Sequence, residues 1–237
     1  MNVINISLKM LARQIKNDKI SIVMVGFPVF AAIGFYFLVP VISEGLINKY
    51  GLQWDLHPYY SMFDAIIVAF SFCTPGFAVT MIMLSELDDK VVSSLCASPL
   101  GRNGYLFSRL GLPILISTIL AIILCFSLNL AKLSIPIRMA LILVSLIACL
   151  LPNMVVIAFG KNKVEGVALF KMSFFTTFSI IIPFFVDNWI QWLFSFLPSF
   201  WIAKMIKDTN FLFAFPAIST TIIWILPLWK KIIKKMQ

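Results

Sequence analysis

The residue types that most often carry out chemistry are scarce in this sequence and poorly grouped. It contains one histidine, His57, and four cysteines, none of which forms a CxxC pair. A zinc site usually needs three or four closely placed ligands, so neither residue type predicts a bound metal. The Gly160-Lys161 pair is followed by Asn162 instead of the Ser or Thr of a phosphate-binding P-loop, and Val155 stands where that motif needs its first glycine. We therefore expect no catalytic site, cofactor or metal in this chain.

The most distinctive charged segment lies between residues 85 and 102. It begins with an acidic cluster and then carries Leu87, Val91 and Leu95 at a spacing of four, which predicts a short amphipathic helix. The helix should end before Ser98-Pro99, because the residue before a proline disfavours the helical conformation. This segment is either a solvated surface helix or a docking element for a cytoplasmic protein. The candidate docking residues are Glu86, Asp88, Asp89, Lys90, Leu95, Ser98, Pro99 and Arg102.

The composition shows what kind of fold must position these residues. Of the 237 residues, 61% are hydrophobic and 12% are charged, and the mean hydropathy is +0.99. Soluble domains are about 45 to 50% apolar and about 25% charged. An aromatic content of 14% also excludes a disordered chain. We therefore predict an all-α integral membrane protein.

Intervals without charged residues predict the transmembrane helices, because a bilayer core needs about 20 apolar residues per helix. Five intervals are long enough alone, and one that ends at Asp187 is long enough if Lys171 extends toward the membrane surface. A seventh span would place the lysine-rich C-terminus outside, against the positive-inside rule. The net charge of +9 is therefore interpreted as a topology signal rather than a nucleic-acid surface. We predict cytoplasmic termini and six spans, at residues 20–43, 65–85, 110–131, 139–160, 167–186 and 209–229.

Two further segments should lie at the membrane surface. Before the first span, apolar residues recur at helical spacing opposite basic ones, which predicts an N-terminal amphipathic interfacial helix. Residues 188–203 contain Trp189, Trp192 and Trp201, and Pro198 would interrupt a continuous helix. They form either a re-entrant or interfacial helical pair between the fifth and sixth spans, or a simple aromatic belt. The loops are too short to fold alone, so residues 1–237 should form a single domain.

The charged segment resembles a loop of the permease subunits of type 2 ABC exporters, which are six-span proteins of this length. In that family, clustered acids precede a hydrophobic helix, then Ser or Thr with Pro-Leu, then an aromatic and a basic residue. Those positions are occupied here by Glu86, Asp88, Asp89, Leu95, Ser98, Pro99, Leu100, Tyr105 and Arg109. Lys90-Val91 departs from the pattern, since many members have Gly-Thr there. A second inner loop is similar to the drug, notably fluoroquinolone, export permeases in the residues Asn162, Lys163, Glu165 and Gly166.

The resemblance implies an ABC-2 type transmembrane domain that is a transporter subunit and not an enzyme. A separate ABC ATP-binding subunit would hold ATP and Mg²⁺, because this chain has no nucleotide-binding domain. A second permease protomer, identical or different, would complete the pathway in the cell membrane. The exported substrate would be an apolar or amphipathic drug, antibiotic or peptide. Two alternatives remain open: a membrane immunity or structural factor without transport, and a secondary carrier, which the lack of charges inside the spans disfavours.

Overall fold

The structure, a computed structural model, describes residues 3–50, 56–128 and 130–235, with the backbone alone at residues 3, 46–50 and 102. These residues form helices and no strands. The α-helices are α1 (Val3–Asn17), α2 (Lys19–Tyr50), α3 (Tyr60–Asp88), α4 (Val91–Ala97), α5 (Gly101–Ser127), α6 (Ile135–Ala148), α7 (Leu150–Phe159), α8 (Lys163–Phe174), α9 (Ile182–Phe185), α10 (Pro198–Lys207) and α11 (Ala214–Lys235). The 3-10 helices are η1 (His57–Tyr59), η2 (Thr177–Ile180), η3 (Trp189–Phe194) and η4 (Phe211–Phe213).

Five stretches of helix in the described residues are long and apolar enough to cross a membrane. They are Lys19–Gly45, His57–Asp88, Asn103–Ser127, Ile135–Phe159 and Phe211–Lys235. The all-α prediction is confirmed, and each stretch overlaps one predicted span. The fourth stretch contains both α6 and α7, which meet at Cys149. Pro152 lies just after this junction and has no N–H to donate to the carbonyl of Ala148, which explains the interruption.

The remaining predicted span, 167–186, is not one long helix but a succession of α8, η2 and α9. Hydroxyl groups interrupt it: Ser173 Oγ donates to the carbonyl of Phe170, and Thr176 Oγ1 donates to that of Ser173. Such bonds compete with regular helical ones. The broken segment nevertheless runs antiparallel to η1 and α3, as three aromatic pairs show. They are Phe77–Phe170, Phe70–Phe174 and Tyr59–Phe185, with ring centroids 3.9, 5.7 and 4.9 Å apart.

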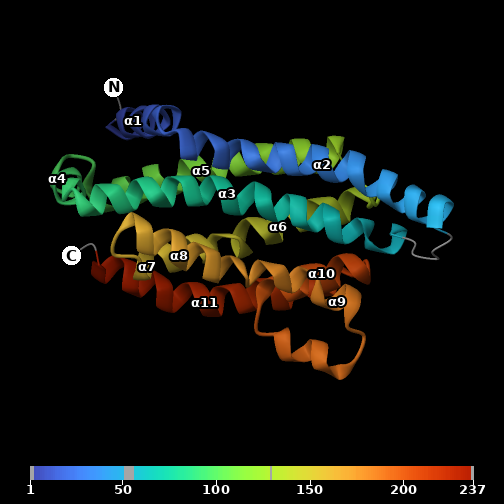
Figure 1. Cartoon of the computed structure of the whole chain (residues 1–237). Helices are drawn as coiled ribbons and strands as arrows, with labels where there is room; N and C mark the ends of the chain where they lie inside the picture. The colour runs from blue at the N-terminus through green and yellow to red at the C-terminus, as the bar shows by residue number, and fades with distance from the viewer. Residues whose placement is uncertain (1–2, 51–55, 129, 236–237) are drawn as a thin grey trace.

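The helices gather into a bundle in which α4 and both ends of the chain lie at one end (Figure 1). We call this the loop end, and the opposite one, where α9 and α10 lie, the far end. α3 is the most enclosed of the five long stretches, whereas α2 and α11 keep mostly exposed apolar faces. Such faces suit contact with lipid.

The segment between α9 and α11 has one surface part and one buried part. η3 lies on the surface, where Trp189 is 74% exposed. α10 is inserted among α3, α6, α9 and α11, and Phe200, Ala203 and Met205 are fully buried. Residues 188–203 therefore contain the exposed η3 and the first residues of the buried helix α10.

The predicted amphipathic helix before the first span is present as α1. Leu11 is fully buried, whereas Lys9, Arg13 and Lys16 are exposed. α1 packs against α5, and also touches α2 and α3. Its apolar side therefore contacts the bundle itself.

Candidate functional site

A buried ion pair joins α3 to α5 near the loop end. Arg109 Nε donates to Glu86 Oε2 at 3.0 Å, and Arg109 Nη2 donates to Glu86 Oε1 at 2.5 Å. The two side chains are 2% and 6% exposed, respectively. A two-bond contact of this kind fixes the orientation of both groups as well as their separation. The pair therefore locks the two helices in one register.

Further hydrogen bonds extend the ion pair to α1. Tyr105 Oη donates to Glu86 Oε2 at 2.9 Å, and Gln14 Nε2 donates to Glu86 Oε1 at 3.3 Å. On the other side, Arg109 Nη1 lies 3.3 Å from both the carbonyl and the hydroxyl oxygen of Ser7. Buried charges are tolerated when their remaining donors and acceptors are satisfied. We call Ser7, Gln14, Glu86, Tyr105 and Arg109 the inner network.

The predicted docking loop lies directly after the inner network but has a different helix boundary. α3 continues to Asp88, and α4 begins only at Val91. Lys90 separates them because it has a left-handed backbone conformation, with φ of 56°. The predicted helical stripe of Leu87, Val91 and Leu95 is therefore wrong as one continuous face. Val92 is the buried residue of α4, and Val91 is 41% exposed.

The structure divides the predicted docking residues into a buried group and an exposed group. Glu86 lies inside the inner network, whereas Asp88, Asp89 and Lys90 are exposed at the turn. Leu95 and Ser98 are half-buried, and Pro99 is exposed. Ser98 Oγ donates to the carbonyl of Leu95 at 2.6 Å and so closes the end of α4. Arg102 belongs to α5, and its side chain is outside the described part of the chain.

The second predicted loop forms the start of α8. Asn162 Oδ1 accepts from the backbone N–H of Glu165 at 2.9 Å, and Glu165 Oε2 accepts from that of Lys161 at 2.9 Å. This exchange resembles a capping box, which satisfies the free N–H groups at a helix start. Lys163 is exposed. Two of the residues chosen by sequence similarity, Asn162 and Glu165, therefore cap a helix.

Gly166 brings this second loop against the first one. A Cβ at Gly166 would lie 2.4 Å from Leu84 Cδ1 and 2.9 Å from Met81 Cε, which is too close for any larger residue without movement. Leu84 precedes Glu86 by two residues on α3. The two predicted loops therefore lie at the same end of the bundle. Lys235 of α11 also reaches this end, where its Nζ donates to the carbonyls of Ile157, at 2.8 Å, and Gly160.

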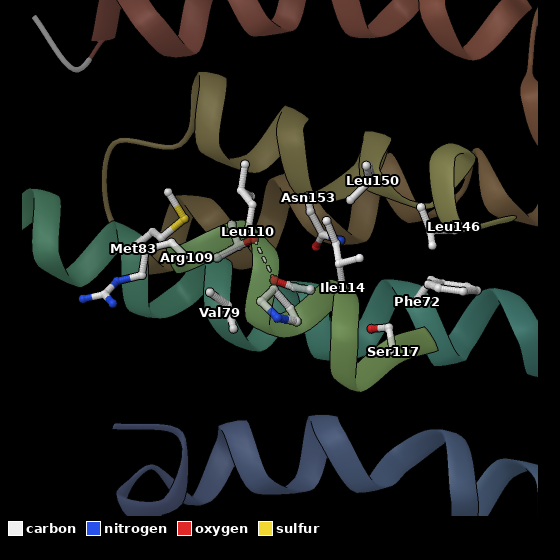
Figure 2. Close-up of a pocket in the computed structure, with 13 residues that line it drawn as sticks. Phe72, Val79, Met83, Arg109, Leu110, Ile114, Ser117, Leu146, Leu150 and Asn153 are labelled. Atoms are coloured by element: carbon white, nitrogen blue, oxygen red, sulfur yellow. Dashed lines mark hydrogen bonds between the residues drawn. The ribbon is translucent and has the colours of Figure 1, made fainter. Parts of the chain in front are cut away.

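A narrow pocket continues from the inner network into the bundle, between α3, α5, α6 and α7 (Figure 2). Arg109 lines one end of it, and Phe72 and Ser117 line the other. Only about 20 Å³ of it is open to the centre of a water molecule, enough for one water. Asn153 Oδ1 lines this pocket, is buried, and has no hydrogen-bond partner among the described residues. A water in the pocket would satisfy it.

Several of these residues had no sequence signal that pointed to them. Ser7 and Gln14 are ordinary polar residues of an amphipathic helix, and their role depends on contacts about 70 to 100 positions away. Asn153 did carry a signal, because it is a polar amide inside a span free of charge. Gly76 fits against it so closely that a Cβ there would lie 2.3 Å from Asn153 Nδ2.

The described residues show a joint between helices and no metal-binding cluster. Within the described residues, no group of three or more His, Cys, Asp and Glu side chains could hold a metal ion. The inner network instead links three helices beneath an exposed loop. The five apolar stretches of spanning length indicate a multi-pass helical membrane protein.

The comparison with protein families gives a more specific result. Residues 12–229 match the family model described as fluoroquinolones export permease protein Rv2686c-like. The match covers most of the chain, which therefore belongs to the Rv2686c-like family of export permeases. This agrees with the resemblance seen in the two loops. No curated protein and no solved structure gives a significant match.

Proposed function

We propose that this chain is the membrane subunit of an ATP-driven exporter of amphipathic drugs in the cell membrane. A separate ABC subunit would bind ATP and Mg²⁺ and hydrolyse the nucleotide, and this chain would have no enzyme activity of its own. A second permease protomer would complete the transport pathway. The fluoroquinolone export permease family of this chain supports the substrate class.

In the proposed topology, both termini and the loop end face the cytoplasm. The broken segment of α8, η2 and α9 is the fifth of the six spans, because its aromatic contacts follow α3 and η1 from Phe77 to Tyr59. α1 lies along the inner leaflet, with its basic residues toward the lipid headgroups. The segment of η3 and α10 enters the outer half of the bundle and returns, since α10 is buried while η3 is exposed.

The inner network is the observation that carries the proposal. Breaking a buried ion pair leaves an uncompensated charge, so the joint between α3 and α5 resists separation. A force on α4 would therefore move α1, α3 and α5 together instead of bending the loop. Rigid-body movement of helices is a common way for a nucleotide-driven change at one site to open or close a pathway elsewhere. ATP binding would supply the force by favouring one state.

The exposed acids of the loop supply the contact with the ATP-binding subunit. Asp88 and Asp89 lie on an inner surface that is otherwise rich in lysine and arginine. Charges at the edge of an interface guide the partner and fix its orientation. We therefore assign docking to Asp88 and Asp89, and transmission of movement to Glu86 and Arg109.

The drug pathway lies between the two permease protomers. The pocket beside Arg109 has room for about one water, so a drug-sized molecule does not fit there in this state of the protomer. A pathway between protomers also explains why one chain needs a second copy or a related subunit.

The proposal is tested by ATP hydrolysis in the reconstituted complex. The permease is purified with the ABC subunit encoded beside it, and ATPase activity is compared with and without the permease. A double variant, Asp88→Asn with Asp89→Asn, should reduce permease-dependent stimulation severalfold while leaving basal hydrolysis unchanged. Asp208→Asn at the far end is the matched control and should stimulate normally. Full stimulation by the double variant, or the absence of any P-loop ATPase partner, would contradict the proposal.

A further inference from the structure

The far end of the bundle contains an open pocket that is separate from the inner network. It lies where the start of α3, the connection between α5 and α6, and the turn after α10 meet, with an open volume of about 520 Å³. Its lining includes aliphatic residues and six polar ones. The polar residues are His57, Tyr60, Ser61, Lys132, Lys207 and Thr209.

The polar groups of this far-end pocket are hydrogen-bond donors, and two of them carry positive charge. None of the described residues that line it is Asp or Glu. Lys132 is exposed and forms no ion pair with any residue that the structure describes. A lysine ammonium has three N–H donors and no acceptor, so Lys132 has its donors available for a ligand.

Lys207 is held in place by two neighbours but is not fully occupied. Its Nζ donates to the carbonyl of Pro183 at 2.5 Å and to Asp187 Oδ1 at 2.7 Å. One of its three N–H donors remains. Asp187 offsets the charge of Lys207, and Asp208 offsets that of Lys204 at 3.4 Å. The charge available to a ligand therefore comes from Lys132.

Backbone strain at the rim shows that the surrounding structure holds this pocket in one shape. Lys132 has φ of 48° and Thr209 has φ of 47°. The described residues include one other non-glycine with positive φ, Lys90. Such a conformation is unusual, above all for a β-branched residue like threonine, and it tends to occur at functional sites.

Hydrogen bonds on the segment that carries Lys132 explain how its strain is maintained. Asp64 is buried at the start of α3, and its two carboxylate oxygens accept from the backbone N–H groups of Leu130 and Ala131, each at 2.9 Å. This anchor fixes the chain immediately before Lys132. The lysine therefore lies at a defined place on the rim instead of on a free loop.

We propose that this far-end pocket binds a phosphate group, presented either by a phospholipid headgroup or as free phosphate. A phosphate offers several acceptor oxygens in different directions, which matches donors that come from three separate segments. Lysine binds phosphate as a point charge, and hydroxyls can complete the contacts. The aliphatic part of the lining and the size of the pocket suit the glycerol portion of a lipid headgroup.

The test measures binding to the full-length protein in a nonionic detergent by titration calorimetry. Three probes are compared: dihexanoyl phosphatidylglycerol, inorganic phosphate, and dihexanoylglycerol, which has the same chains without phosphate. Lys132→Asn removes the charge and keeps a residue that tolerates positive φ. Lys204→Gln is the matched control, because it removes a lysine at the same end that does not line the pocket. Thr209→Gly removes a donor and relieves the backbone strain, so it should fold at least as well as the parent.

We expect Lys132→Asn to weaken binding about tenfold, as for the loss of one charge-assisted hydrogen bond. Thr209→Gly should weaken binding less, and Lys204→Gln should not change it. A Lys132-dependent effect on phosphatidylglycerol alone identifies the lipid headgroup as the source, and one on inorganic phosphate identifies the free anion. The proposal is overturned if Lys132→Asn binds both phosphate probes as the parent does. It is equally overturned if the parent binds phosphatidylglycerol no better than dihexanoylglycerol and does not bind inorganic phosphate.

Discussion

Glu86 and Arg109 form a buried ion pair that connects α3 to α5 and, through Ser7, to α1. Their charges are almost completely removed from water, so each depends on the other and on Tyr105, Gln14 and Ser7. A buried pair is weak evidence for net stabilisation, because both ions lose their hydration. We expect its clearer effect to be specificity, because these donors and acceptors are satisfied together in the observed placement of α1, α3 and α5.

Removal of one charge from this pair should destabilise the protein strongly. Glu86→Gln and Arg109→Gln should each lower the free energy of unfolding by about 3 to 5 kcal/mol, because the remaining charge stays buried without a partner. The double variant should lose less than the sum of the two single losses. Lys204→Gln breaks a more exposed pair with Asp208 and should cost about 1 kcal/mol or less. Unfolding in increasing denaturing detergent measures all four, and strictly additive losses would show that the two charges do not depend on each other.

At the scale of elements, the joints between helices determine how the loop end is arranged. α3 and α4 are separated by the left-handed residue Lys90, and α1 and α2 are separated by Asp18. Many type 2 ABC permeases have glycine where this chain has Lys90, and glycine adopts a left-handed conformation without strain. The departure from the family pattern therefore does not require a different turn.

Lys90→Gly should make the joint before α4 more stable. The left-handed conformation costs a non-glycine residue about 1 to 2 kcal/mol, part of which glycine loses again through its greater freedom when unfolded. Hydrogen–deuterium exchange in the peptide 86–101 should therefore be slower. We expect the free energy of local opening there to rise by about 0.5 to 1 kcal/mol. Ser94→Gly, inside the exposed part of α4, should instead speed exchange there. Faster exchange in Lys90→Gly would contradict the assigned backbone conformation.

Asp18 lies immediately before α2, and its hydrogen bonds to the first turn should make the start of this helix sensitive to acid. Its carboxylate accepts from the Ser21 hydroxyl at 2.6 Å and from the Ile20 N–H at 3.3 Å. The hydrogen bond from Ser21 holds the pKa of the Asp18 carboxyl below its ordinary value of 3.8. Because the pKa is lower in the folded protein, this stabilisation is present above the ordinary pKa and is lost as the pH falls through the folded one.

Asp18→Ala should therefore lower stability by about 0.5 to 2 kcal/mol at pH 7, the usual effect of removing a helix cap. The difference from the parent should begin to shrink below about pH 3.8 and should be smallest once the pH has fallen below the lower pKa of the folded protein. Asp18→Asn keeps a capping oxygen without the titration, so it should remain close to the parent at pH 7. Thermal unfolding as a function of pH measures the effect, and a constant difference down to the lowest pH would refute it.

The sequence predicts elements well where length and polarity decide them, and poorly where distant contacts decide them. Five long stretches are predictable because an apolar run of that length has few other uses. The interruption between α8 and α9 was not predictable, because the same run is compatible with a straight helix until the hydroxyls of Ser173 and Thr176 donate to the backbone carbonyls three residues earlier. The sequence pattern places Glu86 in the same docking cluster as Asp88 and Asp89, because the three acids are close in the sequence. The burial of Glu86 depends on Arg109, 23 positions later on another helix.

At the scale of the whole molecule, the segment of α8, η2 and α9 decides whether the chain crosses the membrane six times. Lys161 and Asn188 are both exposed and lie at the two ends of this segment. Each can be replaced by a single cysteine, in a protein whose four native cysteines are replaced, to test which side of the membrane it faces. A membrane-impermeant maleimide should label Asn188→Cys in intact cells and Lys161→Cys only after permeabilisation. Labelling of both from the same side would mean that this segment does not cross.

The central claim is that this chain exports drugs when a separate subunit hydrolyses ATP. The most direct measurement is uptake of a fluorescent fluoroquinolone into inside-out vesicles that contain the permease and its ABC subunit. We predict ATP-dependent accumulation that needs both subunits, and that falls severalfold in the Asp88→Asn, Asp89→Asn variant although the protein folds and inserts normally. Accumulation that proceeds without the ABC subunit, or vesicles that accumulate no drug with both subunits and ATP present, would contradict the account.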